Sequence, residues 1–212
     1  MTEITPALLL QAYAAGVFPM ADSATDTELF WVDPDPRGVL PLDGVHVPQR
    51  LQRSLRTSDL QIRCDTAFEQ VMRHCAETRP ETWINAEILS LYTALHKLGY
   101  AHSVEAWDKD ELVGGLYGVA IGGLFCGESM FSRTRDASKI ALIHLVAILI
   151  EGGFVLLDTQ FVTDHLRQFG AIEIPRAEYH RRLREALKTP ARFHGVTAFD
   201  PIPVLQSRTQ TS

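Results

Sequence analysis

A carboxylate lies inside an otherwise uncharged stretch, Phe125 to Ser132. Successive side chains of a strand point to opposite faces, so a strand here would place Glu128 and Met130 on one face and Ser129 and Phe131 on the other. A buried carboxylate is costly unless it is paired. Glu128 is therefore expected either to pair with an internal Arg or Lys or to receive a cationic ligand.

Asp158 and Gln160 stand two residues apart at the end of an apolar stretch that begins at Leu156. In a strand both side chains face the same side, and they lie at the carboxyl end, where sheet enzymes often place polar groups. A carboxylate and an amide together can orient an amine, accept its proton or stabilise an oxyanion. The alternative is that Asp158 opens the next loop and caps the helix expected after Thr163.

Two tryptophans and the histidines are less specific candidates. Trp31 and Trp83 lie beside polar segments, where they could stack on a base or cover a peptide, although core packing is the more common role of a single Trp. The eight histidines show no metal-binding spacing, and no Gly-x-Ser-x-Gly elbow is present. The histidines are interpreted as structural, with His165, close to Asp158 in sequence, as the one nearest to a candidate site.

Composition favours a cytoplasmic globular protein. The chain has 212 residues, of which 46% are hydrophobic and 22% charged, and no apolar run is long enough for a membrane span. The N-terminus lacks the basic region of a signal peptide. Cys64, Cys75 and Cys126 show neither a disulfide framework nor zinc-site spacing, so no metal and no cofactor are expected.

The net charge of −6 means that a nucleic acid would have to meet a local basic patch. Such a patch is present in the helix expected over residues 48–56, which carries Arg50, Arg53 and Arg56 at three-residue spacing. These arginines are candidates for phosphate contacts without sequence readout. A solvated helix face is the alternative for each of them.

Hydrophobic periodicity and capping residues divide the chain into short elements. Helices are expected over residues 6–15, 48–56, 66–75, 86–98, 138–151, 163–169 and 176–187. Strands are expected over residues 60–64, 103–107, 112–120, 122–131, 154–160 and 171–174. Pro and Asp between residues 18 and 41 oppose regular structure, and the tail from Thr189 shows only weak signals of order.

The order of elements predicts an α+β (α/β-like) protein with two parts. Residues 1–45 are expected to form a small N-terminal lobe, and residues 46–212 a larger domain with a mixed sheet. An antiparallel meander followed by helix, strand, helix and strand resembles the acyl-CoA N-acyltransferase (GNAT-like) fold. Such a resemblance of fold does not by itself define a reaction.

Several segments resemble one enzyme family, in the same order and over about residues 8–187. They are Trp31-Val32-Asp33-Pro34-Asp35-Pro36-Arg37, Thr82-Trp83-Ile84, Gly115 to Ala120, Leu124 to Ser132, Ala137-Ser138-Lys139, Asp158-Thr159-Gln160, Asp164-His165 and Gly170-Ala171 followed by Glu173 to Arg176. Together they are similar to leucyl/phenylalanyl-tRNA–protein transferases. The resemblance implies transfer of Leu, or less often Phe or Met, from aminoacyl-tRNA to a protein that begins with Arg or Lys, which marks it for degradation by the N-end rule pathway.

The resemblance also implies roles for individual residues. Asp158 and Gln160 would belong to the reaction centre, Glu128 would face the basic side chain of the acceptor, and Trp31 and Trp83 would lie at the tRNA end and the acceptor site. The residues that would line or adjoin the pocket for the transferred side chain are Leu116, Phe125, Leu142, Leu145 and Leu157.

The chain departs from the family at three positions that bear on substrate preference. Phe30-Trp31 stands where two Trp are frequent, Asp136 where Asn is frequent, and Leu145 where an aromatic residue can occur. These differences leave the reaction class unchanged, but the choice between Leu, Phe and Met stays open. A monomer is the default expectation.

Two competing interpretations have different sequence requirements. An acyl-CoA-dependent N-acyltransferase would use a Gly-rich loop before a helix to bind pyrophosphate, but the connection from Ser132 to Ser138 has no glycine. A non-catalytic module that binds tRNA or peptide N-termini would keep Glu128 and the tryptophans. It would not need Asp158 and Gln160 together.

Overall fold

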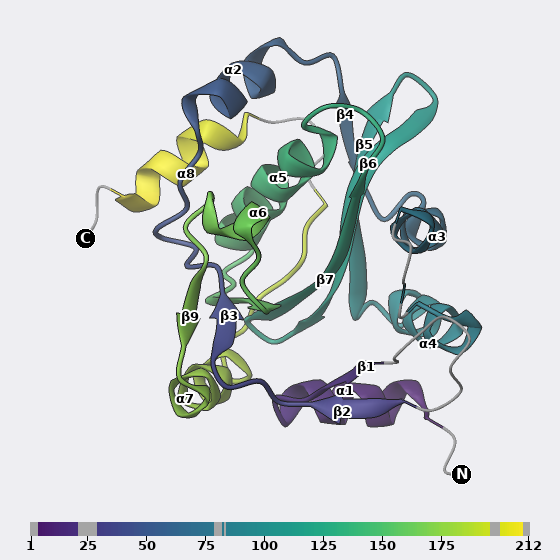
Figure 1. Cartoon of the computed structure of the whole chain (residues 1–212). Helices are drawn as coiled ribbons and strands as arrows, with labels where there is room; N and C mark the ends of the chain where they lie inside the picture. The colour runs from purple at the N-terminus through teal and green to yellow at the C-terminus, as the bar shows by residue number, and fades with distance from the viewer. Residues whose placement is uncertain (1–3, 21–28, 79–81, 83, 196–199, 210–212) are drawn as a thin grey trace.

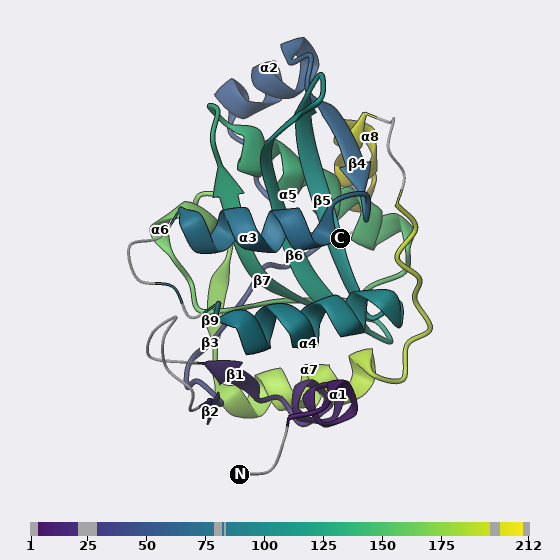
Figure 2. The same cartoon turned by 90° about the vertical axis from the view of Figure 1, so that its right-hand side faces the viewer.

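The fold is built around one mixed sheet with helices on both faces (Figures 1 and 2). The computed structural model describes residues 4–20, 29–78, 82, 84–195 and 200–209. The seven-stranded sheet has the order β4-β5-β6-β7-β8-β3-β9. Its strands are β3 (Arg37–Val39), β4 (Gln61–Cys64), β5 (Ala101–Asp108), β6 (Glu111–Ile121), β7 (Leu124–Ser132), β8 (Leu156–Gln160) and β9 (Ile172–Ile174).

Most neighbouring strands are antiparallel. Strands β5, β6 and β7 form the predicted meander, with tight turns between Asp108 and Glu111 and between Ile121 and Leu124. Among the strands that the structure describes, only β7 and β8 pair in parallel, because α5 (Ala137–Glu151) connects them across one face of the sheet. The α+β class and the mixed sheet predicted from the sequence are confirmed.

Each face of the sheet carries its own hydrophobic core. Figures 1 and 2 show α5 on one face and α3 (Phe68–Glu77) and α4 (Ala86–Lys97) on the other. Helix α5 is apolar all round, and every residue from Ile140 to Ile150 is buried, as a helix of that composition requires. No helix of the described residues is long and apolar enough to cross a membrane.

The remaining helices surround the sheet, and two of them, α1 (Pro6–Ala14) and α6 (Asp164–Arg167), begin with a side-chain cap. The Thr5 hydroxyl accepts the Leu8 N–H at the start of α1, and Pro6 occupies the first turn. These helices are α1 (Pro6–Ala14), α2 (Gln49–Thr57), α6 (Asp164–Arg167), α7 (Arg176–Ala186) and α8 (Pro201–Thr209).

The segment between residues 18 and 41 is more regular than predicted. It contains β1 (Phe18–Met20) and β2 (Phe30–Val32), which form a two-stranded antiparallel ribbon, and then β3. Pro19 is tolerated because β1 is an edge strand with a single partner. Strand β3 lies within the first 45 residues, yet it pairs with β8 and β9 of the large sheet. The division of the chain at residue 45 stays a prediction.

The weak order signals in the tail did not predict α8, which forms over Pro201–Thr209. This helix packs on α5, where Ile202 and Leu205 are buried, and the Asp200 carboxylate accepts the Ile202 N–H at its start, at 3.0 Å. The apolar surface of α5 therefore stabilises a segment whose own sequence is a weak helix former.

Candidate functional site

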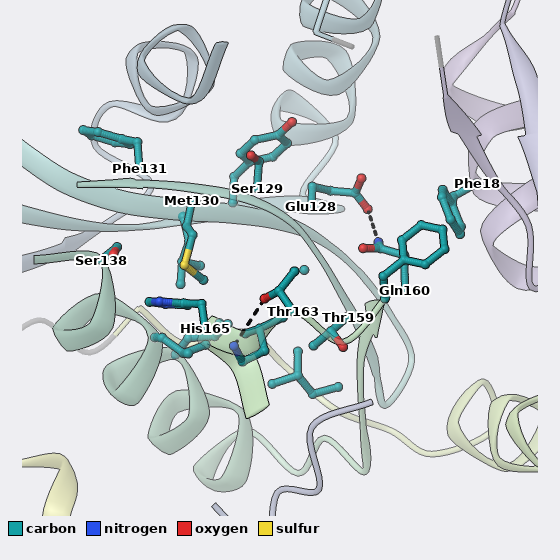
Figure 3. A pocket seen from close by; sticks show the side chains of 18 of the residues that line it. Phe18, Glu128, Ser129, Met130, Phe131, Ser138, Thr159, Gln160, Thr163 and His165 are labelled. Carbon is teal, nitrogen blue, oxygen red and sulfur yellow. Dashed lines mark hydrogen bonds between the residues drawn. The ribbon is translucent and has the colours of Figure 1, made fainter. Parts of the chain in front are cut away.

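The site lies where two parallel strands separate. Strands β7 and β8 pair only over Leu124–Cys126 and Leu156–Asp158. Beyond this point β7 continues beside β6 to Ser132, whereas β8 continues beside β3. A pocket of about 550 Å³ opens next to the point of divergence, and its walls include side chains from both hydrophobic cores (Figure 3).

One part of this pocket is apolar. Its walls include Leu116, Leu142, Leu145 and Leu157, four of the five residues expected around the transferred side chain. Phe125 is not among the described lining residues, because its ring packs behind the wall against Phe154 and Phe193. This part of the pocket could accept an aliphatic or aromatic apolar side chain, but it offers no charged partner to a polar one.

Glu128 occupies a β-bulge in β7. Tyr117 is opposite Ser129 and Gly118 is opposite Gly127, so the register skips Glu128. The extra residue changes the alternation of side chains. Figure 3 shows Glu128 and Met130 on opposite sides of the strand. The prediction that they share a face was therefore wrong.

The Glu128 carboxylate is held by uncharged donors. Oε1 accepts the Tyr13 hydroxyl at 2.7 Å and the Gln160 side-chain amide at 3.2 Å, and Oε2 accepts the Tyr92 hydroxyl at 3.3 Å. Burial raises the pKa of Glu128 to about 7, although the hydrogen bond from Tyr13 acts in the opposite direction. Among the described residues no Arg or Lys pairs with Glu128, so the carboxylate is available to a cationic ligand.

The internal cation pairs with Asp158 instead. The Arg37 guanidinium donates from Nε to Oδ1 at 2.9 Å and from Nη2 to Oδ2 at 2.6 Å. Oδ1 also accepts the backbone N–H of Gln160 at 2.9 Å, and Oδ2 accepts the Tyr179 hydroxyl at 2.9 Å. Asp158 is 0% exposed and is not among the described residues of the pocket wall. Both carboxylate oxygens of Asp158 therefore stabilise the end of β8.

The alternative role of Asp158 as a helix cap was wrong. The Thr163 hydroxyl itself accepts the Leu166 N–H at the start of α6. Asp158 and Gln160 do lie on the side of the sheet that carries Tyr13, Tyr92 and Tyr179. Asp158 accepts the Tyr179 hydroxyl, and Gln160 donates to Glu128, which also accepts the Tyr13 hydroxyl. The predicted shared orientation of the two side chains is confirmed.

Arg37 was not recognised from the sequence. It is 1% exposed and lies between the rings of Phe18 and Tyr179, and its Nη1 donates to the Gly16 carbonyl at 2.9 Å. Burial lowers its pKa, but the hydrogen bonds and charge of Asp158 outweigh burial and raise it above its usual value. The same reasoning that required a partner for a buried Glu128 would have required one for Asp158.

Gln160 adopts a backbone conformation that is unusual for its type. Its φ is +57°, in the left-handed region, which costs free energy in a residue with a Cβ atom. The hydrogen bond from its N–H to Asp158 holds this conformation, and its side chain lines the pocket and reaches Glu128. Backbone strain that surrounding contacts maintain is frequent at functional sites.

The other candidates lie at different distances from the pocket. Trp31 is opposite Pro19 in the β1–β2 ribbon and is 40% exposed, next to the pocket-lining residues Phe18 and Met20. Trp83 lies outside the described residues. His165 lines the pocket, and its Nε2 atom has no hydrogen-bond partner within the described part of the chain. Burial and the charge of Lys139 lower the pKa of His165.

The three arginines of α2 are exposed and have no ion-pair partner among the residues that the structure describes. Helix α2 also contacts the start of α5, since the Ser54 hydroxyl donates to the Asp136 carboxylate at 3.2 Å. Ser138, two residues further on, lines the pocket. The helix with Arg50, Arg53 and Arg56 therefore lies close to the pocket's α5 end.

An apolar pocket that ends at a carboxylate without a described Arg or Lys partner can bind an apolar group next to a cationic one. Comparison with known proteins gives the family. Residues 39–184 match the family described as leucyl/phenylalanyl-tRNA protein transferase, and residues 2–35 match its N-terminal domain. The chain belongs to the leucyl/phenylalanyl-tRNA–protein transferase family, which confirms the resemblance seen in the sequence.

Transferases of this family are similar in sequence to the chain over nearly their whole length. A leucyl/phenylalanyl-tRNA–protein transferase of Paramagnetospirillum magneticum is 61% identical over 196 residues, which cover 91% of this chain and 94% of that protein. The transferase of Phenylobacterium zucineum is 58% identical and covers 95% of this chain and 92% of its own. The transferase of Caulobacter vibrioides is 57% identical over 208 residues, or 96% of both chains.

Proposed function

We propose that this protein transfers Leu, and also Phe or Met, from aminoacyl-tRNA to the N-terminal Arg or Lys of other proteins, which marks them for degradation by the N-end rule pathway. Family membership supports the reaction. The observation that carries the site assignment is the pocket at the β7–β8 divergence, where apolar walls meet Glu128 and Gln160. Cytoplasmic location, a monomeric state and a GNAT-like larger domain are part of the same proposal.

The aminoacyl side chain would occupy the leucine-lined part of the pocket. An apolar wall of this kind discriminates between side chains that differ by one methylene by only about 1–3 kcal/mol. Acceptance of Leu, Met and Phe together is therefore consistent with the pocket. Charged side chains would lose their hydration without gaining a partner there.

The acceptor would place its basic side chain at Glu128 and its α-amine near Gln160. The amine nitrogen attacks the carbonyl carbon of the ester, an amide bond forms, and the ribose oxygen leaves and takes up a proton. The donor is an activated ester, so no ATP is needed. Most of the rate would come from holding amine and ester together, with the Gln160 amide orienting the amine or the developing oxyanion.

Asp158 is better described as a positioning residue than as a base. Both of its oxygens are already engaged by Arg37, Tyr179 and the Gln160 backbone. It would act by fixing the left-handed conformation of Gln160. We assign the amine proton to the leaving ribose oxygen and not to Asp158, since an α-amine with a pKa of about 8 needs little help.

The test is transfer of radiolabelled leucine from Leu-tRNA to a model protein that begins with Arg, beside a version that begins with Ala. Label on the Arg protein alone supports the proposal. No label on either protein, with Leu-tRNA intact, contradicts it and favours the binding module or an acyl-CoA enzyme. The latter is already disfavoured by the connection into α5, which has no glycine.

The preference for a basic N-terminus should depend on pH. Glu128 has a pKa of about 7, so its ionised fraction rises about tenfold between pH 6 and 8. The KM of an Arg-initiated peptide should fall by about the same factor, since the cation binds only the carboxylate form. The Glu128→Gln protein has no carboxylate at this position, so with the same Arg-initiated peptide it reports the titration of the α-amine alone. A pH profile that is unchanged in Glu128→Gln would contradict this assignment.

The α2 arginines should contribute to tRNA binding. The double substitution Arg50→Ala/Arg53→Ala should raise the KM for Leu-tRNA and reduce the slope of log affinity against log salt by about 1 for each arginine. The KM for a donor without the tRNA body, such as phenylalanyl-adenosine, should be the same in the double variant as in the wild-type protein. Arg184→Ala on α7 is the matched control, since Arg184 is also exposed. Equal effects of the two changes would contradict the proposal that α2 binds tRNA.

A further inference from the structure

Asp136 is a carboxylate among basic side chains, at the α5 end of the pocket. Its Oδ1 lies 3.4 Å from the Lys139 ammonium, and its Oδ2 lies 3.7 Å from Nε of the Arg135 guanidinium. Oδ2 also accepts the Ser54 hydroxyl of α2 at 3.2 Å. Ser138, two residues further on, lies in the pocket wall (Figure 3). Asp136 therefore connects α2 to the end of α5 that lines the pocket.

Asp136 does not have the usual function of an aspartate at the start of a helix. An N-cap side chain normally accepts an N–H of the first turn. The Asp136 side chain forms no such bond, and its backbone has a φ of +63°, in the left-handed region. The Ser138 N–H donates to the Ser132 hydroxyl instead, at 3.1 Å. The carboxylate is therefore used for the two cations and for Ser54, and not for the helix.

The two cations keep the capacity to bind a second anion. Lys139 and Arg135 are 30% and 67% exposed, whereas Asp136 is 13% exposed. An ammonium has three N–H donors and a guanidinium has five, and both pairs with Asp136 are longer than a normal N–H···O hydrogen bond. Together with the three exposed arginines of α2, these cations form a basic surface beside the pocket. Phosphate is the anion that the proposed donor carries.

We propose that Asp136 limits how tightly the tRNA backbone binds beside the pocket. Its carboxylate competes with tRNA phosphates for Lys139 and Arg135, and its charge repels phosphates that contact α2. The deacylated tRNA therefore leaves faster after each transfer. This inference rests on the proposed function and adds a residue that adjusts the exchange of the donor.

The charge of Asp136 can be removed without changing its other contacts. Asparagine tolerates the left-handed region, and its side-chain oxygen can still accept the Ser54 hydroxyl. Asp136→Asn therefore changes the charge alone. Glycine also adopts this backbone conformation without strain, so Asp136→Gly gives a second measurement where Asp136→Asn folds poorly. Ser54→Ala is the converse change, since it removes the bond to α2 and keeps the carboxylate.

The experiment measures the binding of deacylated leucine tRNA by fluorescence anisotropy at several salt concentrations, and its dissociation rate by stopped flow. Asp136→Asn should bind about three- to tenfold more tightly than the wild-type protein, the scale expected for one charge near a phosphate in a high dielectric. The slope of log affinity against log salt should steepen by about 1, because a freed cation gains a phosphate. Dissociation should slow in proportion.

Matched variants locate the cause of the change. Ser54→Ala keeps the charge and should not tighten binding. Glu151→Gln removes an exposed charge at the opposite end of α5 and should not tighten it either. In Asp136→Asn/Lys139→Gln the salt slope should return toward the wild-type value. The decrease in KM should be confined to Leu-tRNA, since phenylalanyl-adenosine has no phosphate.

Equal affinity and equal salt slope for Asp136→Asn and the wild-type protein would overturn this inference and leave the transfer reaction standing. Equal tightening in Glu151→Gln or in Ser54→Ala would overturn it as well, because the effect would then come from the net charge or from the α2 contact. Failure of the wild-type protein to transfer leucine from Leu-tRNA would instead remove the proposed function.

Discussion

Asp158→Asn is expected to lower the free energy of unfolding by about 3–5 kcal/mol, since removal of one partner of a buried ion pair leaves the other charge uncompensated. Arg37 and Asp158 are 1% and 0% exposed. The asparagine can keep its oxygen toward Arg37 Nε and the Gln160 N–H. Its NH₂ group then faces Arg37 Nη2 and the Tyr179 hydroxyl, which are donors themselves. Urea unfolding followed by circular dichroism measures the loss, and turnover should fall with it.

The matched control is Glu69→Gln. Glu69 also forms an ion pair with an arginine, but Glu69 and Arg73 are 51% and 57% exposed. Exposed pairs contribute about 0–1 kcal/mol, so this change should leave stability and transfer nearly as they were. Equal unfolding midpoints for Asp158→Asn and the wild-type protein would contradict the assigned role of the Arg37–Asp158 pair.

A double replacement separates stability from activity. In Arg37→Met/Asp158→Leu both charges of this buried pair are removed, and such exchanges are often neutral or stabilising. Transfer should stay low in this variant, because the Gln160 N–H has lost its acceptor. Wild-type turnover in a stable double variant would mean that the pair only holds the fold together.

Gln160→Gly is expected to lower kcat by about 10²–10³-fold, the usual cost of losing one oriented donor at a reaction centre. Stability should change by no more than about 1 kcal/mol, because glycine adopts positive φ without strain. Gln160→Asn should be intermediate, since Asn tolerates the left-handed region and keeps an amide one methylene shorter. Single-turnover transfer from Leu-tRNA to an Arg-initiated peptide gives the rate.

Lys109→Gly is the control for the backbone change. Lys109 has a φ of +54°, similar to Gln160, but it lies in the exposed hairpin turn between β5 and β6. Its replacement by glycine should leave kcat unchanged. If Gln160→Gly also turned over at the wild-type rate, the amide would have no part in the reaction.

Local sequence patterns predicted most of the helices and strands and part of the site. The helix over residues 86–98 and the meander after it follow from apolar periodicity and turn residues, and the structure has α4 and β5–β7 there. Asp158 and Gln160 could be paired because their spacing matches a strand. These features depend on neighbours in the sequence, and the sequence contains that information directly.

Features that depend on distant contacts were not predictable in this way. The bulge at Glu128 is a property of the pairing of β6 with β7, and α8 forms because α5 offers an apolar surface. Arg37 lies in a segment rich in Pro and Asp, and only the fold shows that it is buried next to Asp158. In each case the partner in space decides the structure.

The insertion of β3 between β8 and β9 has a consequence for how the chain is made. Synthesis proceeds from the N-terminus, so Arg37 emerges 121 residues before Asp158, and β9 follows later still. The ribosome must therefore deliver most of the chain before this part of the sheet can close, and contacts over such separations form slowly. A nascent or truncated chain without β8 has neither Gln160 nor Asp158, so catalytic competence should arise only near the end of translation.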